Sequence, residues 1–303
     1  VDPAESKAGK TLSQLGGGEA GGVGPRVAAS LDDAMIAEAD VAVVCTSSRF
    51  DEIAPMVIRL LEGGSHVVST CEQMTWPTYR HPDLAAQVDA AGRQAGRAAL
   101  GSGVNPGFVM DTLAVSISTM VRRVQAVRCV RRVEASVRRE ALQSKIGATL
   151  TPGRFNELKA EGRIGHAGLA ESAALVVAGL GREASPGSVQ ETLEPVIADR
   201  HLNSSLGPIE PGFVAGIRNR ATWQGEGLDV ELDLTMAVGV EDPHDRIHLE
   251  GPVQLELRLP GAVPGDSATV AVMLNLIPLL GKVEPGLRTM LDMPVAGCRG
   301  MDR

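Results

Sequence analysis

The chain has 303 residues, enough for two packed domains, because a single hydrophobic core stops growing near about 250–300 residues. Hydrophobic residues make up 44% and charged residues 22%, and 29 basic against 37 acidic side chains give a net charge of −8. This balance argues against a nucleic-acid partner, which requires a basic face. Since no apolar run approaches the ~18–20 residues of a membrane span, we expect a cytoplasmic protein without membrane contact.

The four cysteines show none of the spacings that bind metals or form a disulfide framework. Cys45, Cys71, Cys129 and Cys298 lie far apart, without a Cys-x-x-Cys pair or a Cys/His cluster. We therefore expect no metal site and reduced thiols, which fits the cytoplasm.

Between residues 26 and 100, short apolar runs alternate with polar or helical stretches. The runs cover residues 26–29, 41–45, 66–69 and 98–100, and segments 53–61 and 82–92 have helical character. This alternation predicts parallel strands joined by crossover helices, that is, an α/β fold with a Rossmann-type doubly wound parallel sheet. Ligands of such sheets bind at the carboxyl ends of the strands, where small or polar residues follow each run.

Beyond Asp111 the pattern changes to helices and longer alternating strands. Helices are predicted at 112–120, 151–161 and 171–180, and strands at 121–137, 189–197, 212–223, 228–240 and 246–259. This part is typical of an α+β domain built on an open mixed sheet with one covered face. An apolar helix predicted at 268–280 returns to the first domain. We therefore expect a dinucleotide-binding domain of residues 1–111 plus 265–303 and a substrate and dimerisation domain of residues 112–264.

Seven arginines alternate with valines around the first of these strands. They are Arg122, Arg123, Arg128, Arg131, Arg132, Arg138 and Arg139. The alternation is typical of strands with one solvated face, and we prefer this interpretation to an anion-binding site.

Four blocks of the sequence resemble one enzyme family, in the family's order. Residues 101–111 read Gly-Ser-Gly-Val-Asn-Pro-Gly-Phe-Val-Met-Asp, 135–148 contain Gln-Ser-Lys-Ile-Gly-Ala, 165–172 read Gly-His-Ala-Gly-Leu-Ala-Glu-Ser, and 265–294 begin Gly-Asp-Ser-Ala-Thr-Val-Ala. The chain resembles the 2,4-diaminopentanoate dehydrogenases and the related native amine dehydrogenases, whose fold is similar to dihydrodipicolinate reductase. The resemblance implies a homodimeric, NAD- or NADP-dependent oxidoreductase that converts an amine into a ketone and ammonia, reversibly.

The glycine-rich phosphate-binding turn of a dinucleotide fold is not found. A strand, a Gly-x-Gly-x-x-Gly turn and a helix should open such a domain, whereas Val1-Asp2-Pro3 resembles the end of the family's second strand. The glycine-rich run 16–22 does not follow an apolar strand and is predicted to be a surface loop. We expect that about thirty residues ahead of Val1 are missing and that the chain as given binds its cofactor weakly or not at all. An in-frame stop codon directly before Val1 would contradict this.

Glu72 and His166 are the candidate catalytic residues. Glu72 follows the run 66–69, where the family has its catalytic glutamate, and a carboxylate there could accept a proton and stabilise a cationic iminium. A glutamate at a strand end can also simply pair with a helix dipole. His166 lies in a block that matches the family and could orient the substrate or relay a proton, although a lone histidine is more often a surface residue.

The cofactor residues are expected at the ends of the predicted strands. They are Thr46, Ser47 and Ser48 after the run 41–45, Cys71 beside Glu72, and Asn105 and Pro106 in the turn that the resemblance places beside the nicotinamide. The three hydroxyl-bearing residues could also cap the next helix. Asp2, at the tip of the apparent second strand, would bind the adenosine ribose and repel a 2′-phosphate, which favours NAD. Lys7 and Lys10 could still receive that phosphate, and Asp-Pro could be a simple turn.

Trp76, Arg138 and Lys145 are the candidate substrate contacts, together with His166. Lys145 matches a family position, and either Lys145 or Arg138 could bind the carboxylate of 2,4-diaminopentanoate. A simple aliphatic amine would instead need a small apolar pocket. Trp76 could form a wall of the pocket or pack in the core. Thr149 stands where the family usually has a glycine, so the loop geometry there is expected to differ.

Two alternatives to an amine dehydrogenase remain open at this level. A dihydrodipicolinate reductase-like enzyme would reduce a cyclic imine or enamine, but its His-His and lysine-rich substrate loop is not found. A cofactor-free, non-catalytic homologue would fit the missing glycine turn, but it would have no need of Glu72, Asn105 and His166. Titration with NADH would distinguish this last alternative.

Overall fold

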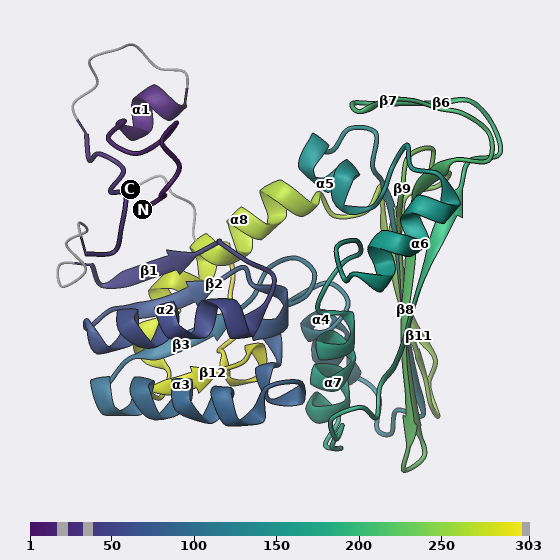
Figure 1. Ribbon diagram of the computed structural model, residues 1–303. Coiled ribbons are helices and arrows are strands. Elements are labelled where there is room, and N and C mark those ends of the chain that lie inside the picture. The colour runs from purple at the N-terminus through teal and green to yellow at the C-terminus, as the bar shows by residue number, and fades with distance from the viewer. Residues whose placement is uncertain (17–23, 33–38, 299–303) are drawn as a thin grey trace.

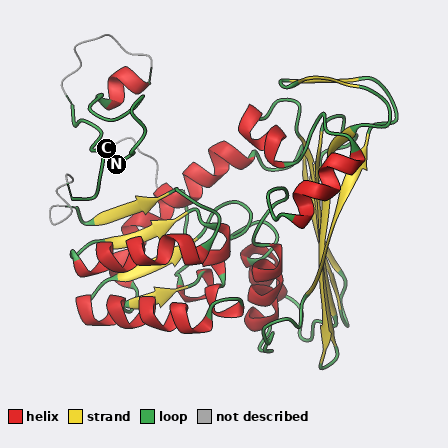
Figure 2. Cartoon of the chain, viewed as in Figure 1, coloured by secondary structure: helices red, strands yellow, loops and turns green. Residues whose placement is uncertain are grey.

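The computed structural model of the protein describes residues 1–16, 24–32 and 39–298. Two main sheets lie side by side, a parallel sheet flanked by helices and a larger mixed sheet (Figures 1 and 2). Helices α4 (Thr112–Ser118) and α7 (Leu169–Gly179) lie between the two sheets. The predicted fold class, a doubly wound parallel sheet combined with an α+β part on an open mixed sheet, is confirmed.

The parallel sheet has the strand order β1-β2-β3-β12, and all of its pairs are parallel. Its strands are β1 (Val41–Val44), β2 (His66–Ser69), β3 (Ala98–Gly101) and β12 (Gly286–Arg288). Its helices are α2 (Phe50–Glu62), α3 (Pro82–Ala95) and α8 (Gly265–Leu276). Because β12 pairs with β3, the last part of the chain returns to this sheet. The domain boundaries at 111/112 and 264/265 stay a prediction.

Helices cover both faces of the parallel sheet, as its apolar strands require. Successive residues of a strand point to opposite faces. Val67 packs into one buried cluster with side chains of α2 and α3, whereas Val68 packs into another with Met273 and Leu276 of α8. Short 3-10 turns also belong to this part of the chain: η2 (Glu72–Thr75) and η3 (Pro77–Tyr79) lie between β2 and α3, η4 (Ile277–Lys282) lies between α8 and β12, and η5 (Met290–Asp292) follows β12.

The mixed sheet has the order β11-β10-β4-β9-β8-β5, and only β4 and β9 run parallel. Its strands are β4 (Ala126–Glu134), β5 (Gln190–Ile197), β8 (Val214–Gly225), β9 (Leu228–Ala237), β10 (His244–Glu250) and β11 (Leu255–Pro260). Smaller elements near it are α5 (Glu140–Lys145), α6 (Pro152–Ala160), β6 (Leu202–Ser204) and β7 (Gly207–Ile209). Nearly all of α7 is buried, because its two sides contact the mixed sheet and the turns after β2.

Three strand predictions were wrong in whole or in part. The predicted strand 246–259 is divided, because residues 251–254 separate β10 from β11. Residues 26–29 form no strand: Arg26 makes an isolated bridge with Thr11, Val27 bonds to Gly9 and Lys10, and Ala28 accepts one bond from the amide of Asp2. An extended run needs a continuous partner, and no described strand lies alongside it. The run 121–137 is a strand only over β4, and its end is followed by the unpredicted helix α5. The glycine-rich run 16–22 lies outside the described residues beyond Gly16.

The arginine alternation was also misread at Arg131. Arg128 and Arg132 are on the exposed face of β4, whereas Arg131 is on the inner face with Cys129 and Val133 and is only 1% exposed. Strand residues alternate with a period of two, so an arginine an odd number of positions from Arg128 must face inward. Over the described ranges, no helix is long and apolar enough to cross a membrane.

Candidate active site

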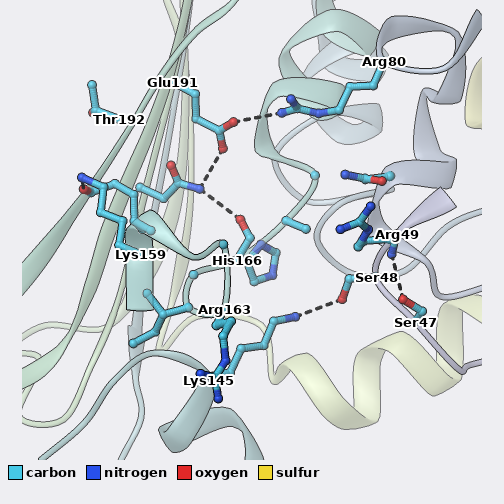
Figure 3. A pocket seen from close by; sticks show the side chains of 18 of the residues that line it. Ser47, Ser48, Arg49, Arg80, Lys145, Lys159, Arg163, His166, Glu191 and Thr192 are labelled. Carbon is cyan, nitrogen blue, oxygen red and sulfur yellow. Dashed lines mark hydrogen bonds and ion pairs between the residues drawn. The ribbon is translucent and has the colours of Figure 1, made fainter. Parts of the chain in front are cut away.

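A cleft runs between the carboxyl ends of the parallel strands and the inner side of the mixed sheet. Two neighbouring cavities of about 730 and 660 Å³ form it, and both are lined by Ser47, Ser48, Lys145 and His166. Figure 3 shows the larger cavity, where the Lys145 side chain extends to Ser48 below His166. The cleft is at the edge where doubly wound sheets bind their ligands. We refer to the 660 Å³ cavity as the inner cavity.

Glu72 lines the inner cavity, at the first position of η2 and directly after β2. Lys145, the last residue of α5, places Nζ 3.2 Å from Glu72 Oε1 and 3.1 Å from the Ser48 hydroxyl. Glu72 is 19% exposed and Lys145 37% exposed. The parallel sheet thus supplies the carboxylate and the serine, and the part of the chain beyond Asp111 supplies the cation.

The electrostatic surroundings keep Glu72 ionised. Burial opposes its ionisation, but Lys145 and then His166 outweigh it, and together they hold the pKa of the carboxyl below its usual value. Burial lowers the pKa of His166 to about 4, Lys145 and Arg131 act in the same direction, and Glu72 opposes them. At neutral pH the cleft therefore presents a carboxylate beside an uncharged imidazole.

Close packing at Gly168 places the loop that carries His166 beside Glu72 and Pro106. Gly168, with a φ of +91°, precedes α7, and a Cβ added there would lie 2.4 Å from Pro106 Cγ and 2.8 Å from Glu72 Cβ. Only glycine allows this approach. The His166 carbonyl accepts a bond of 3.1 Å from Asn219 Nδ2, and the buried Nδ1 of the ring has no partner among the described residues. The ring nitrogen is available to a ligand.

The turn after β3 contributes an amide without protein partners. Asn105 and Pro106 line the inner cavity together with Thr46 and Ser102. Both Oδ1 and Nδ2 of Asn105 are buried and form no hydrogen bond with the described residues. A buried amide left unpaired costs about 1–3 kcal/mol for each group. Asn105 therefore offers one acceptor and one donor to a ligand in the cavity.

Arg131 is a site residue that the sequence interpretation missed. Its guanidinium lies on the wall of the inner cavity, where it donates to Asp245 Oδ1 at 2.6 Å and to the Val263 carbonyl at 2.7 Å. Nε is buried without a partner in the described structure. Arg138, as predicted, lines the same cavity, and it pairs with Asp266 at 3.2 Å. The period-two alternation of β4 was the signal that could have located Arg131.

A second network, also missed, joins the two sides of the cleft (Figure 3). Arg80, just after η3, donates to the fully buried Glu171 of α7 at 2.5 Å and to Glu191 of β5 at 3.1 Å. Asn219 donates to the other oxygen of Glu191 at 3.0 Å as well as to the carbonyl of His166. The segment after Glu72 is thus bonded to Glu191 through Arg80, and the loop of His166 is linked to the same carboxylate through Asn219.

Three predicted site residues are not in the cleft. Cys71 is 1% exposed in the core of the parallel sheet, and burial raises the pKa of its thiol to about 12. Trp76 packs against the two hydrophobic clusters around it, which is the core alternative. Asp2 lies in the segment before α1 (Leu12–Leu15), where Lys7 Nζ approaches its carboxylate to 2.6 Å. Thr46, Ser47, Ser48, Glu72, Asn105, Pro106, Arg138, Lys145 and His166 do meet around the inner cavity.

Many dehydrogenases that use a nucleotide cofactor bind it at the carboxyl edge of a doubly wound sheet and take further polar groups for the cleft from a second domain. The fold and the cleft place this protein in that class of oxidoreductases. A family model described as the 2,4-diaminopentanoate dehydrogenase C-terminal domain matches residues 108–302, so the chain belongs to the 2,4-diaminopentanoate dehydrogenase family.

Two individual proteins are similar to the chain. The 2,4-diaminopentanoate dehydrogenase of Acetoanaerobium sticklandii is 28% identical over 263 residues, which cover 85% of this chain and 74% of that protein. The structure of an amine dehydrogenase from Mycobacterium smegmatis superposes with a TM-score of 0.81 at 23% identity, over 98% of this chain and 88% of that one. The second likeness is one of fold.

Proposed function

We propose that the protein is a nicotinamide-dependent amine dehydrogenase. The reaction is R-CH(NH3+)-R′ plus NAD(P)+ plus water giving R-CO-R′, NH4+, NAD(P)H and H+, and its reverse is a reductive amination. The observation that carries the proposal is the ionised Glu72, held by Lys145 at 3.2 Å beside the neutral His166, at the carboxyl edge of the parallel sheet.

Glu72 has two tasks in this proposal. The ammonium of the substrate first releases one proton to solvent, because hydride can leave only from the neutral amine. Loss of hydride from its carbon then leaves a positive iminium, and a carboxylate in a partly desolvated cleft stabilises that charge. Water must then add to the iminium carbon, and Glu72 is the group that accepts the proton of this water. His166 stays uncharged near neutral pH, so it carries no positive charge that could pair with the Glu72 carboxylate in place of the iminium. Its free Nδ1 can orient the substrate or the water.

The residues of the inner cavity fit a nicotinamide group. The unpaired Oδ1 and Nδ2 of Asn105 match the donor and the acceptor of a carboxamide. Thr46 and Ser47 follow β1 at the same edge, where they can approach the rest of the cofactor. When bound, the cofactor supplies the hydride acceptor. Asp2 lies outside this cleft and pairs with Lys7, so its part in the choice between NAD and NADP stays a prediction.

The charge of the inner cavity favours an amine that also bears a carboxylate. Four cationic side chains, Arg131, Arg138, Arg139 and Lys145, line it against the carboxylates Glu72 and Asp266. Arg131 is matched by Asp245 and Lys145 by Glu72. Arg138 and Arg139 share the single carboxylate of Asp266, which leaves positive charge for a substrate anion. We propose Arg138 as its main contact, as in recognition of 2,4-diaminopentanoate.

Formation of reduced cofactor tests this proposal. The chain is assayed as given, and also joined to a strand–glycine turn–helix segment ahead of Val1, with 2,4-diaminopentanoate and with short aliphatic amines. We expect turnover that is lost by at least about 100-fold in Glu72→Gln. The matched control is Glu62→Gln at the exposed end of α2, which should keep full turnover. We expect Arg138→Gln to raise the KM for the carboxylated amine and not for the aliphatic amines.

Other results would point elsewhere. Turnover only with a cyclic imine would favour the reductase alternative, and a folded protein that neither binds NADH nor turns over any substrate would favour a non-catalytic homologue. Full activity of Glu72→Gln would refute the assigned role of this carboxylate. The homodimer stays a prediction, and sedimentation equilibrium would test it.

A further inference from the structure

Asn105 lines the inner cavity with an unpaired amide, and this amide needs support to keep its position. An asparagine amide can rotate and shift with its turn, so an unpaired amide stays in place only if the backbone that carries it is held. Asn105 and Pro106 are followed by Gly107, whose φ is +122°. A Cβ added to Gly107 would lie 2.5 Å from the Gly103 nitrogen, so the turn is closed tightly on itself.

The start of α4 binds both backbone polar groups of Gly107. The Gly107 amide donates to Asp111 Oδ2 at 2.7 Å, and the Thr112 hydroxyl donates to the Gly107 carbonyl at 2.7 Å. Asp111 Oδ1 in turn accepts from the Thr112 amide at 2.5 Å. Asp111 is the N-cap of α4, so the same side chain that begins the helix also holds the turn.

Asp111 also binds to α7, which packs against α4. The Asp111 carboxylate accepts a third hydrogen bond on Oδ2, from the Ser172 hydroxyl at 2.7 Å. Both side chains are essentially inaccessible to solvent. Ser172 lies one helical turn after Gly168, the glycine that packs against Pro106. One buried carboxylate thus connects the turn that carries Asn105 with a helix that packs on the mixed sheet.

The chemistry of the site requires a carboxylate rather than an amide. The Gly107 and Thr112 amides can only donate, and Ser172 donates as well, so the group between them must accept on both of its oxygens. Burial raises the pKa of Asp111, and the Gly107, Ser172 and Thr112 hydrogen bonds oppose that rise. An asparagine in its place would direct an NH2 group at a donor.

We propose that Asp111 is a positioning residue. Together with the hydroxyl of Ser172, which donates to it, Asp111 holds the turn so that the Asn105 amide faces the carboxamide of the nicotinamide. This inference rests on the proposed dehydrogenase function. It assigns to Asp111 no contact with substrate or cofactor. Its effect reaches the bound ligand only through the turn, and it ties the position of that turn to α7.

The test compares NADH with ADP-ribose, which lacks the nicotinamide, as ligands of the full chain. In Ser172→Ala we expect the Kd for NADH to rise about three- to tenfold, the order of one hydrogen bond to a charged group, while the Kd for ADP-ribose stays within about twofold. Asp111→Asn should have a larger effect in the same direction. Ser118→Ala removes a serine hydroxyl bonded to the Val115 carbonyl of α4, away from the turn, and should change neither constant.

Equal weakening of both ligands, or no weakening of either, would overturn the proposal. A second measurement does not depend on the cofactor. Hydrogen exchange of the amides of residues 104–109 should accelerate about three- to tenfold in Ser172→Ala relative to β9, and not in Ser118→Ala. Equal acceleration in the turn and in β9 would show a purely global role and refute the proposal. If NADH binds neither to the wild-type chain nor to the chain joined to the strand–glycine turn–helix segment, the proposed function fails, and the exchange experiment still decides the role of Asp111.

Discussion

Replacing Lys145 with methionine removes the positive charge that lies 3.2 Å from the Glu72 carboxylate and keeps an unbranched side chain in its place. At that distance the attraction between the two charges is about 5 kcal/mol for an effective dielectric constant near 20. Because Lys145 is 37% exposed, water screens much of this energy. We discount it to about 1.4 kcal/mol, which is one tenfold step in proton affinity.

The direction of the effect follows from the pKa of Glu72. Lys145 helps to hold this pKa below its usual value, so its removal raises the pKa. The ionised form of Glu72 is then lost at a higher pH as the solution is acidified, and kcat/KM should fall about tenfold at a pH where the wild type has only begun to lose activity. The stability that ionised Glu72 contributes, which is present above the unfolded pKa and is lost on acidification, should shrink as well.

The direct assay is a pH titration of the Glu72 side-chain carboxyl by ¹³C NMR, with the pH profile of kcat/KM beside it. The carboxyl signal is needed because Lys145 also lowers the pKa of His166, so both groups respond to the substitution. Lys145→Arg keeps the charge and serves as the control. An unchanged Glu72 titration in Lys145→Met, or an equally large shift in Lys145→Arg, would refute the electrostatic argument.

Two further predictions concern packing around the cleft. Asp245→Asn leaves the guanidinium of Arg131 buried without a counter-charge, and we expect it to lower the free energy of unfolding by about 3–5 kcal/mol in urea denaturation; a loss below about 1 kcal/mol would show that water or another group replaces the carboxylate. Gly168→Ala forces a methyl group against Glu72 and should abolish turnover, whereas Gly187→Ala, at a similar φ of +81° but in open space, should lose only about 1 kcal/mol of stability and keep its activity.

Much of the fold could be predicted from the sequence, because periodicity and glycine positions report local structure. The runs at 41–45, 66–69 and 98–100 became β1, β2 and β3, and α2 ends at Glu62 before a glycine pair, as expected. The run 26–29 failed because apolar character shows that a segment can be extended and does not show that a partner lies beside it. Pairing is a property of the whole sheet.

The active site could be predicted only in part. Glu72 was located from the family resemblance, since a lone glutamate after a strand has many uses. Its contact with Lys145 joins residues 73 positions apart in the chain, a distance at which no local pattern reports contact. The period-two alternation of β4 predicts that Arg131 faces inward, but Arg131 was interpreted together with the exposed arginines beside it. Asn105 was expected beside the nicotinamide, while the three bonds of Asp111 behind it depend on how α4 and α7 meet.

The position of β12 has a consequence for synthesis of the protein. This short strand pairs with β3, although the whole mixed sheet lies between them in the sequence. On the ribosome, β1, β2 and β3 emerge well before β12, so one edge of their sheet stays open until residues 286–288 have left the exit tunnel. Exposed strand edges promote wrong pairing, and contacts between distant residues form slowly. Chains released before residue 286 should therefore aggregate or be degraded rather than accumulate as a folded nucleotide-binding half.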